Sequence, residues 1–417
     1  MSLSAPSPTR KKVRVEQLRP GMFVLELCGA WLDHPFWRTS FLLKDQADLE
    51  RLRQSPVREV WIDIARGLDV APEAPAAARA DAVPPPPVVP VRTATPEKVP
   101  LEAEIGRART ICVRARQEVG GLFQQARMGQ ALRTAPVVEL VEDITDSVLR
   151  CPSALVSLAR LKTKDEYTYL HSVSVCALMV SLGRQLGLPG PQLREAGLAG
   201  LLHDLGKAAI PLEILNKPGR LTDEEFALVK EHPRAGHAML SDAGVTSESA
   251  LDVCLHHHER IDGRGYPDGL AGEAISLHAR MGAVCDVYDA ITSDRPYKAG
   301  WHPAEAIRRM AQWTKEGHFD ERVFQAFVKC IGIYPTGSLV KLQSGRLAVV
   351  LEQRESSLLT PRVKVFFSTR SNLHIPPEVV DLASPLVRDR IVSHENPEDW
   401  GFRHLDELWA GLPARPA

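Results

Sequence analysis

The sequence predicts a mainly α-helical protein, with a small α+β domain before the helical part and a short β appendage after it. Three observations indicate this fold class. Apolar residues recur at helical spacing from Pro136 to about Val328, without a convincing strand run between them. A stretch rich in proline and alanine precedes that region, over residues 71–100. Alternating apolar and polar residues return at Ser338 and indicate short strands.

The chain begins with a predicted α+β domain over residues 11–70. Two short alternating runs flank the turn signal Pro20-Gly21, and residues 59–64 have the pattern of another strand. Residues 71–100 contain nine prolines and eight alanines, a composition that builds neither a helix nor a central strand. They also lack the apolar mass for a core, so we predict a semi-extended linker there.

The helical part is expected to comprise a connector over residues 101–135 and a bundle over residues 136–335. One helix of the bundle shows a core stripe at helical spacing, formed by Leu277, Met281, Val284, Tyr288 and Ile291. Three strand-like runs then predict the β appendage over residues 336–385. The last residues, 386–417, are expected to form a C-terminal tail.

Composition and charge exclude several classes of function. The 417 residues carry a net charge of -1, so no basic field indicates a DNA or RNA polymer as partner. The longest uncharged apolar stretch, Ser172–Gly183, is too short to span a membrane, and residues 1–12 do not resemble a secretory signal. Seven scattered cysteines without a C-x-x-C pair are typical of reduced thiols. We therefore expect a cytoplasmic protein that does not bind membranes.

Histidines are concentrated in one part of the helical region. Seven of the fourteen fall between positions 171 and 258, namely His171, His203, His232, His237, His256, His257 and His258. Imidazole and carboxylate together suit divalent metals such as zinc, iron or manganese. The adjacent pair His203-Asp204 is notable, because the second oxygen of a carboxylate can bridge to another ion.

Each of these pieces has an ordinary explanation when taken alone. His171 lies on an apolar helix face, where a histidine usually belongs to the core. His203-Asp204 is a common dipeptide, and the run of three histidines at 256–258 can be a polar helix end. The ordered set, followed by Asp286 on a helix with a second polar face, favours a metal site.

Four ordered motifs in the helical region resemble those of one known family. They are His203-Asp204-Leu205-Gly206-Lys207, His232-Pro233-x-x-Gly236, His257-His258-Glu259-x-x-Asp262-Gly263-x-Gly265-Tyr266-Pro267 and Asp286-x-Tyr288-Asp289-Ala290-x-Thr292-Ser293-x-Arg295-Pro296-Tyr297. Together they resemble the HD-GYP family, a branch of the HD-domain metal phosphohydrolases. The resemblance implies an all-helical HD-domain bundle. The motif Leu18-Arg19-Pro20-Gly21-Met22 also resembles the small domain that often precedes HD-GYP domains.

The resemblance implies a role for each matching residue. One ion would be held by His171, His203, Asp204 and Asp286, and a second by His232, His257 and His258, with Asp204 bridging the two. Lys207 would face the bound phosphate and act in catalysis with Asp204. Gly265 and Tyr266 belong to a loop that resembles a substrate-binding lip, and Arg295 and Lys298 match positions that contact substrate phosphates.

One position departs from the family pattern. Members with three ions carry a glutamate one helical turn before the first histidine, where this sequence has Tyr167. Glu166 is adjacent but would point about 100° away on a helix. We therefore expect two divalent ions, iron, manganese or similar, rather than three.

The family's typical members hydrolyse the bacterial second messenger cyclic di-GMP. By resemblance, this chain would be a metal-dependent phosphodiesterase that uses a metal-bridging hydroxide to produce the linear dinucleotide pGpG, with GMP open as a further product. Two alternatives remain. One is a catalytically silent sensor or interaction module for cyclic di-GMP, and the other is a hydrolase of another cyclic dinucleotide. A homodimer or a signalling protein remains open as a partner.

Overall fold

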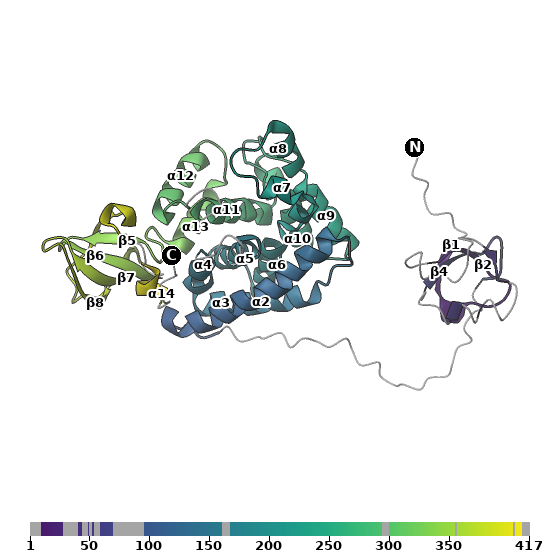
Figure 1. Cartoon of the computed structure of the whole chain (residues 1–417), viewed down its shortest axis with the longest axis horizontal. Coiled ribbons are helices and arrows are strands. Elements are labelled where there is room, and N and C mark those ends of the chain that lie inside the picture. Colours follow the sequence, from purple (N-terminus) through teal and green to yellow (C-terminus); the bar gives the residue numbers. More distant parts are fainter. Residues whose placement is uncertain are drawn as a thin grey trace. The chain divides into compact units, whose positions relative to one another are not determined.

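The computed structural model describes residues 10–27, 41–43, 49, 52–53, 59–69, 96–160, 167–293, 300–354, 357–402 and 405–410. The chain divides into two compact units, Met1–Val91 and Arg92–Ala417 (Figure 1). Residues 71–95 of the predicted linker lie outside the described residues. Within the described part of the chain, no helix is both long enough and apolar enough to cross a membrane.

The first unit contains a small antiparallel sheet, which includes the three short strands that the sequence predicts there. Its strands are β1 (Arg10–Arg14), β2 (Phe23–Leu27), β3 (Phe41–Leu42) and β4 (Glu59–Asp63), in the order β1-β4-β2-β3. Alternate residues of these strands point to one face, and Val13, Val24 and Ile62 are buried there. This face and the residues packed on it form a hydrophobic core of their own.

The second unit is a helical bundle that continues into a β-sheet. Its longer helices are α2 (Leu101–Arg127), α3 (Ala135–Arg150), α4 (Pro152–Arg160), α5 (Tyr167–Gln185), α6 (Gly190–Leu202), α9 (His232–Asp242), α10 (Glu248–His256), α11 (Leu277–Thr292), α12 (Pro303–Lys315) and α13 (Glu321–Ile331). The 3-10 turn η4 (Leu205–Ala209) and the short helices α7 (Leu212–Leu215) and α8 (Asp223–Val229) lie between α6 and α9.

Helix α5 is the central element of the bundle. It packs against α2, α3, α4, α6, α11 and α13. The uncharged stretch Ser172–Gly183 lies within it and is buried on every side. A helix that is apolar all round has no face suited to water, so it folds into the interior. His171 precedes this stretch by one residue and is therefore carried into the core.

Helix α2 occupies most of the predicted connector and belongs to the bundle. Ala108, Ile111, Ala115 and Val119 recur at helical spacing, and all four are buried in the main core. The buried Glu104 accepts two hydrogen bonds of 2.8 Å from the guanidinium of Arg150 on α3. This pair fastens the beginning of α2 to the end of α3.

The β appendage is a five-stranded antiparallel sheet in the order β8-β7-β6-β5-β9. Its strands are β5 (Leu339–Leu342), β6 (Arg346–Arg354), β7 (Ser357–Ser368), β8 (Leu373–Asp381) and β9 (Ile391–His394). The first three confirm the predicted strand runs. One side of the sheet, with Leu347 and Phe366, joins the main core of the bundle, whereas Val340 and Val350 belong to a separate cluster.

The segment expected as a C-terminal tail contains regular structure. Strand β9 pairs with β5, and the helix α14 (Asp406–Ala410) packs on β6. Trp409 of α14 is 5% exposed and belongs to the main core. The four residues of β9 are too few to show a period in the sequence, and the strand forms because β5 offers it an unpaired edge.

Candidate metal centre

The seven residues predicted as metal ligands come together at one end of α5. His171 lies in the first turn of α5, His203 caps the end of α6, and Asp204 precedes η4. His232 begins α9, His257 caps the end of α10, His258 follows it, and Asp286 lies on α11. All are buried except His258, whose side chain is 21% exposed.

His171, His203 and Asp286 form the first group. The Nε2 atoms of the two histidines lie 3.1 and 3.7 Å from Oδ1 of Asp286. Atoms that bind one ion at about 2 Å lie roughly 3 to 4 Å apart, so this spacing fits a shared ion. These three residues are one of the groups whose ligand atoms all lie within 4.8 Å of one another.

His232, His257 and His258 form the second group, by the same distance criterion. Nε2 of His232 lies 3.3 Å from Nε2 of His257. These two nitrogen atoms face each other, and the group contains no carboxylate. Such a pair of imidazoles suits a cation that both nitrogens can coordinate.

Asp204 lies between the two groups and directs one oxygen to each. Its Oδ2 is 3.4 Å from Nε2 of His171 and 3.4 Å from Nε2 of His203. Its Oδ1 is 3.4 Å from Nε2 of His232 and 3.7 Å from Nε2 of His257. This is the arrangement of a carboxylate that bridges two neighbouring ions.

Within the described part of the chain, two buried atoms of the proposed ligands lack a hydrogen-bond partner. They are Nε2 of His203 and Oδ1 of Asp204. Leaving such an atom unpaired costs about 1–3 kcal/mol, so native proteins rarely do so without a reason. Both atoms are lone-pair donors that face the predicted ion positions, and the residues present therefore fit divalent cations.

The second nitrogen of each buried histidine fixes the direction of its ring. Three of these rings face a backbone carbonyl oxygen. The distance is 2.8 Å between Nδ1 of His203 and Gly200, 2.7 Å between Nδ1 of His232 and Val229, and 2.9 Å between Nδ1 of His257 and Val253. Nδ1 of His171 lies 2.7 Å from Oδ2 of Asp289. With Nδ1 as the donor, each Nε2 keeps its lone pair free to bind metal.

The local electrostatics favour the ligand forms of most of these groups. Burial opposes ionisation, yet Lys207 and the neighbouring histidines hold the pKa of Asp204 well below its usual value. His171 and His203 do the same for the pKa of Asp286. Burial lowers the pKa of His258 to about 3, so its imidazole is neutral. Burial also acts on His203, but Asp204 and Asp286 outweigh it and raise its pKa to about 9.

Two glycines bring Asp204 close to His232. A β carbon on Gly206 would lie 1.8 Å from the carbonyl oxygen of His232, and one on Gly236 would lie 2.9 Å from the backbone nitrogen of Gly206. The turn η4 and helix α9 can therefore touch only because both positions lack a side chain. The contact explains why the motifs that contain Asp204 and His232 each include a glycine.

The loop after His258 folds back over the centre. The ring of Tyr266 stacks on that of His258, with centroids 4.7 Å apart and an angle of 28° between the planes. A β carbon on Gly265 would lie 2.4 Å from Cα of Glu259, so the loop turns tightly there. The buried Glu259 accepts hydrogen bonds from the backbone nitrogens of Asp268 and Gly269, at 2.7 and 3.0 Å.

Lys207 lies where the centre meets solvent. Its Nζ is 2.5 Å from Oδ2 of Asp204, and its side chain is 29% exposed. Arg295 and Lys298, predicted to contact substrate phosphates, lie outside the described residues. Tyr167 begins α5 one turn before His171, but its side chain also lies outside the described part.

Sequence reasoning assigned no role to two residues of this site. Asp289 stands in the same sequence motif as Asp286, but its contact with His171 depends on the packing of α5 against α11. Glu259 stands directly after the histidine pair in the loop motif, which was the one signal of its function.

Two domain families match the chain. Residues 10–137 match a family described as a domain of unknown function, DUF3391, and residues 150–323 match the HD domain. A cyclic di-GMP phosphodiesterase of Pseudomonas aeruginosa is 62% identical over 406 residues, which cover 96% of this chain and 96% of the relative.

Other relatives match less than half of this chain. A cyclic di-GMP phosphodiesterase response regulator of Xanthomonas campestris is 42% identical over 182 residues, or 42% of this chain and 47% of the relative. A 3'3'-cGAMP-specific phosphodiesterase of Vibrio cholerae is 35% identical over 206 residues, or 48% of this chain and 46% of the relative. The match to the Pseudomonas protein along nearly the whole length, with the HD domain and the preceding DUF3391 domain, shows that this chain belongs to the HD-GYP family of HD-domain phosphohydrolases.

Proposed function

We propose that this chain is a metal-dependent phosphodiesterase that hydrolyses cyclic di-GMP to the linear dinucleotide pGpG. The position of Asp204, with one oxygen toward each group of histidines, is the observation on which the proposal rests. The substrate is inferred from the relative in Pseudomonas aeruginosa, which matches over 96% of both chains and is named a cyclic di-GMP phosphodiesterase.

The proposed centre holds two divalent ions, iron, manganese or similar. His171, His203 and Asp286 would hold one ion, His232, His257 and His258 the other, and Asp204 would touch both. Bound ions of this kind supply Lewis acidity and lower the pKa of water toward neutrality. The mixture of imidazole and carboxylate ligands suits mid-row transition metals better than magnesium or calcium. Position 167 holds a tyrosine instead of the glutamate found in members with three ions, which supports two ions rather than three.

The other residues of the site would bind and orient the phosphodiester. Lys207 is close enough to Asp204 to present its ammonium group to a phosphate oxygen beside the ions. Burial raises the pKa of the Tyr266 phenol above its usual value, so its hydroxyl stays protonated and can donate a hydrogen bond. One face of its ring stacks on His258, and the other face would stack on a guanine base. Arg295 and Lys298 are proposed to bind the phosphates from the segment after α11.

A direct test compares the chain with its Asp204→Asn variant in manganese- or iron-loaded form. We expect the parent to convert cyclic di-GMP to pGpG, and the variant to be slower by about a thousandfold or more, because several kcal/mol of Lewis-acid stabilisation is lost. Chromatography of the products measures the rate and shows whether pGpG is cut further to GMP. Asp242→Asn, an exposed carboxylate at the end of α9, serves as the matched control and should keep the parent rate.

The same assay with 3'3'-cGAMP decides between the two substrates. The Vibrio cholerae relative named for that dinucleotide gives this alternative its weight. If 3'3'-cGAMP is hydrolysed faster than cyclic di-GMP, then 3'3'-cGAMP is the preferred substrate. Binding of cyclic di-GMP without a linear product would instead indicate a silent sensor, and parent-like activity of Asp204→Asn would contradict the proposed centre.

A further inference from the structure

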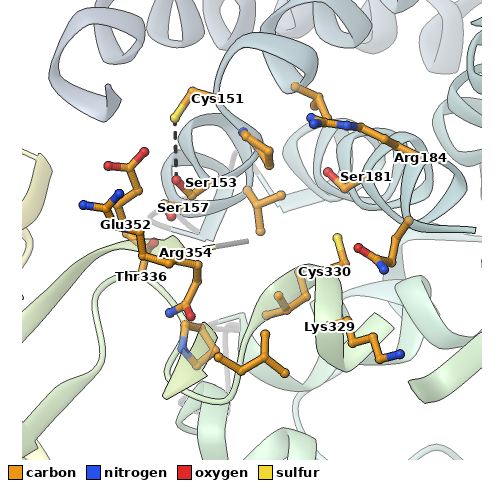
Figure 2. A pocket seen from close by; sticks show the side chains of 18 of the residues that line it. Cys151, Ser153, Ser157, Ser181, Arg184, Lys329, Cys330, Thr336, Glu352 and Arg354 are labelled. Atoms are coloured by element: carbon orange, nitrogen blue, oxygen red, sulfur yellow. Dashed lines mark hydrogen bonds between the residues drawn. The ribbon is translucent and has the colours of Figure 1, made fainter. Parts of the chain in front are cut away.

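A cavity of about 1080 Å³ lies between the helical bundle and the β appendage, away from the metal centre (Figure 2). Three of its arginines already pair with a carboxylate, and each pair lies within one wall: Arg150 with Glu104, Arg354 with Asp381 and Arg362 with Glu352. A guanidinium that is already paired offers little charge to an incoming anion. These pairs hold the walls together and assign no ligand to the cavity, whereas a second set of charged side chains surrounds the loop over the metal centre.

Residues 263–270 form the loop that places Tyr266 on His258, and we call them the Tyr266 loop. The base of this loop is closed by an isolated antiparallel bridge between Asp262 and Ala271. The backbone nitrogen of Asp262 also donates a hydrogen bond of 2.8 Å to a carbonyl oxygen in the turn after α12. These contacts fix the base, so the position of the tip depends on contacts of its own.

Arg234 on α9 holds the tip from one side. Its guanidinium Nη2 donates to the carbonyl oxygen of Pro267 at 3.2 Å and to Oδ1 of Asp268 at 2.5 Å. One side chain thus holds the two residues that directly follow Tyr266. The side chains of Arg234 and Asp268 are 52% and 33% exposed. A single ion pair at this exposure contributes little, so its effect depends on what else holds Asp268.

Asp268 is the residue on which further contacts converge. Its Oδ2 lies 3.1 Å from Nε2 of His256, and Nδ1 of His256 lies 2.7 Å from Oδ1 of Asp252 on α10. The other oxygen of Asp252 accepts a hydrogen bond from Ser276, the residue that caps α11. The backbone nitrogen of Asp268 donates to the buried Glu259. Contacts from α9 and from the end of α10 therefore meet on one loop carboxylate, and such a network holds more firmly than an isolated pair.

None of these three side chains is specified by the motifs that mark the site. Arg234 stands at an open position of the motif His232-Pro233-x-x-Gly236. His256 directly precedes the loop motif, and Asp268 directly follows it. The motifs thus account for the proposed ligands and for Tyr266, but not for the contacts that hold the tip of the loop.

We propose that Arg234, His256 and Asp268 position the Tyr266 loop for substrate binding. They are positioning residues, because they would act on the substrate only through Tyr266. The inference rests on the proposed function, in which Tyr266 binds cyclic di-GMP. A loop that is already held in place pays less ordering entropy when the substrate binds. Loss of these contacts should therefore weaken substrate binding and leave the chemical step intact.

Hydrogen–deuterium exchange of the manganese-loaded full chain, without substrate, tests the position of the loop. In Arg234→Gln and in Asp268→Ala, the backbone amides of residues 263–270 are expected to exchange about three- to tenfold faster than in the parent. The amides of α5 should keep the protection of the parent. Arg308→Gln, on α12 with a side chain that is 79% exposed, and Asp242→Ala, at the exposed end of α9, are the matched controls and should leave the loop unchanged.

Steady-state kinetics with cyclic di-GMP tests the consequence for the substrate. We expect each single variant to raise KM by about three- to fivefold, with kcat within about twofold of the parent and an unchanged metal content. The double variant should raise KM no further than Asp268→Ala alone, since both substitutions remove the same contact. Arg234→Lys keeps a cation at this position and should recover most of the lost affinity. A parent that binds cyclic di-GMP without hydrolysing it would refute the proposed hydrolysis alone, because the dissociation constant then takes the place of KM.

Three outcomes would overturn the proposal. One is unchanged exchange of the loop amides in both variants, which would show that other contacts hold the tip. Another is faster loop exchange with the KM of the parent, because the position of the loop would then not govern binding. The third is loss of metal from Arg234→Gln, which would show that Arg234 supports the neighbouring His232 and not the loop.

Discussion

Asp289 is not a proposed ligand, but it contacts one of the proposed ligands, His171. Its Oδ2 lies 2.7 Å from Nδ1 of His171, and both side chains are buried. A carboxylate in this position orients the ring, fixes the proton on Nδ1 and makes Nε2 a stronger ligand. We therefore expect Asp289 to influence a bound ion only through His171.

We expect Asp289→Asn to lower metal affinity or activity by about ten- to a hundredfold, since the amide keeps the shape of the side chain and removes its charge. Metal content by elemental analysis and the rate of cyclic di-GMP hydrolysis measure the effect. A positioning role predicts that high metal concentration restores part of the activity. Unchanged metal binding in this variant, with Asp242→Asn as the reference, would contradict the role.

At the level of single residues, the sequence predicted which side chains gather at the candidate centre better than it predicted their surroundings. Ordered histidines at family spacing were enough to single out His171, His232 and His258, which lie in the two groups at the candidate centre. Their role as metal ligands stays a prediction. The stacking of Tyr266 on His258 depends on the path of a loop, and spacing contains no information about that path. The roles of Arg295 and Lys298 stay predictions.

Among the elements, the turn η4 and helix α9 make the tightest contact at the site. Gly206 faces the carbonyl oxygen of His232 at a distance that leaves no room for a side chain. The separation of these two backbones sets how far Asp204 lies from His232. A wider separation would therefore weaken the second group of ligands before the first.

We expect Gly206→Ala to destabilise the protein by about 1–3 kcal/mol, the usual cost of overpacking, and to lower the number of ions bound. Denaturant unfolding and metal analysis measure the two effects. The control is Gly120→Ala on α2, where an added β carbon meets nothing within 4 Å. That variant should be neutral or slightly more stable, since alanine favours helix. An equal effect of both substitutions would contradict the role of the contact.

The elements differed in how far the sequence could predict them. The burial of helix α5 could be predicted, because an uncharged run such as Ser172–Gly183 has to be buried along its whole length. The edge strand β8 contains Pro376 and Pro377, which weaken any strand prediction, although prolines are tolerated at a sheet edge. The sequence did not predict that α2 packs into the bundle, because the apolar face of an amphipathic helix does not reveal which element covers it.

For the whole molecule, the centre exists only when the bundle is folded. Its residues come from α5, α6, α9, α10 and α11 and the turns beside them, and His171 and Asp289 alone are 118 positions apart. An unfolded chain cannot bring these groups to one point, so ions that bind them stabilise the folded state selectively.

We expect removal of metal by a chelator to lower the melting temperature of the chain. An ion present at a hundred times its dissociation constant contributes about 2.7 kcal/mol, which is roughly 5–10 °C for a domain of ordinary size. Calorimetry with and without added manganese measures the shift. The Asp204→Asn variant should show a much smaller one, and a melting temperature of the parent that is independent of metal would contradict the coupling.

The helix α14 has a practical consequence for anyone who shortens this protein. Trp409 lies in the main core, and the carbonyl of Leu408 accepts a hydrogen bond from Lys364 on β7. A fragment that stops after the sheet would uncover the apolar surface beneath that indole and leave the ammonium group without its acceptor. A fragment that ends where the recognised motifs or the sheet end would therefore lack part of the hydrophobic core. Aggregation of such a fragment would reveal nothing about the enzyme.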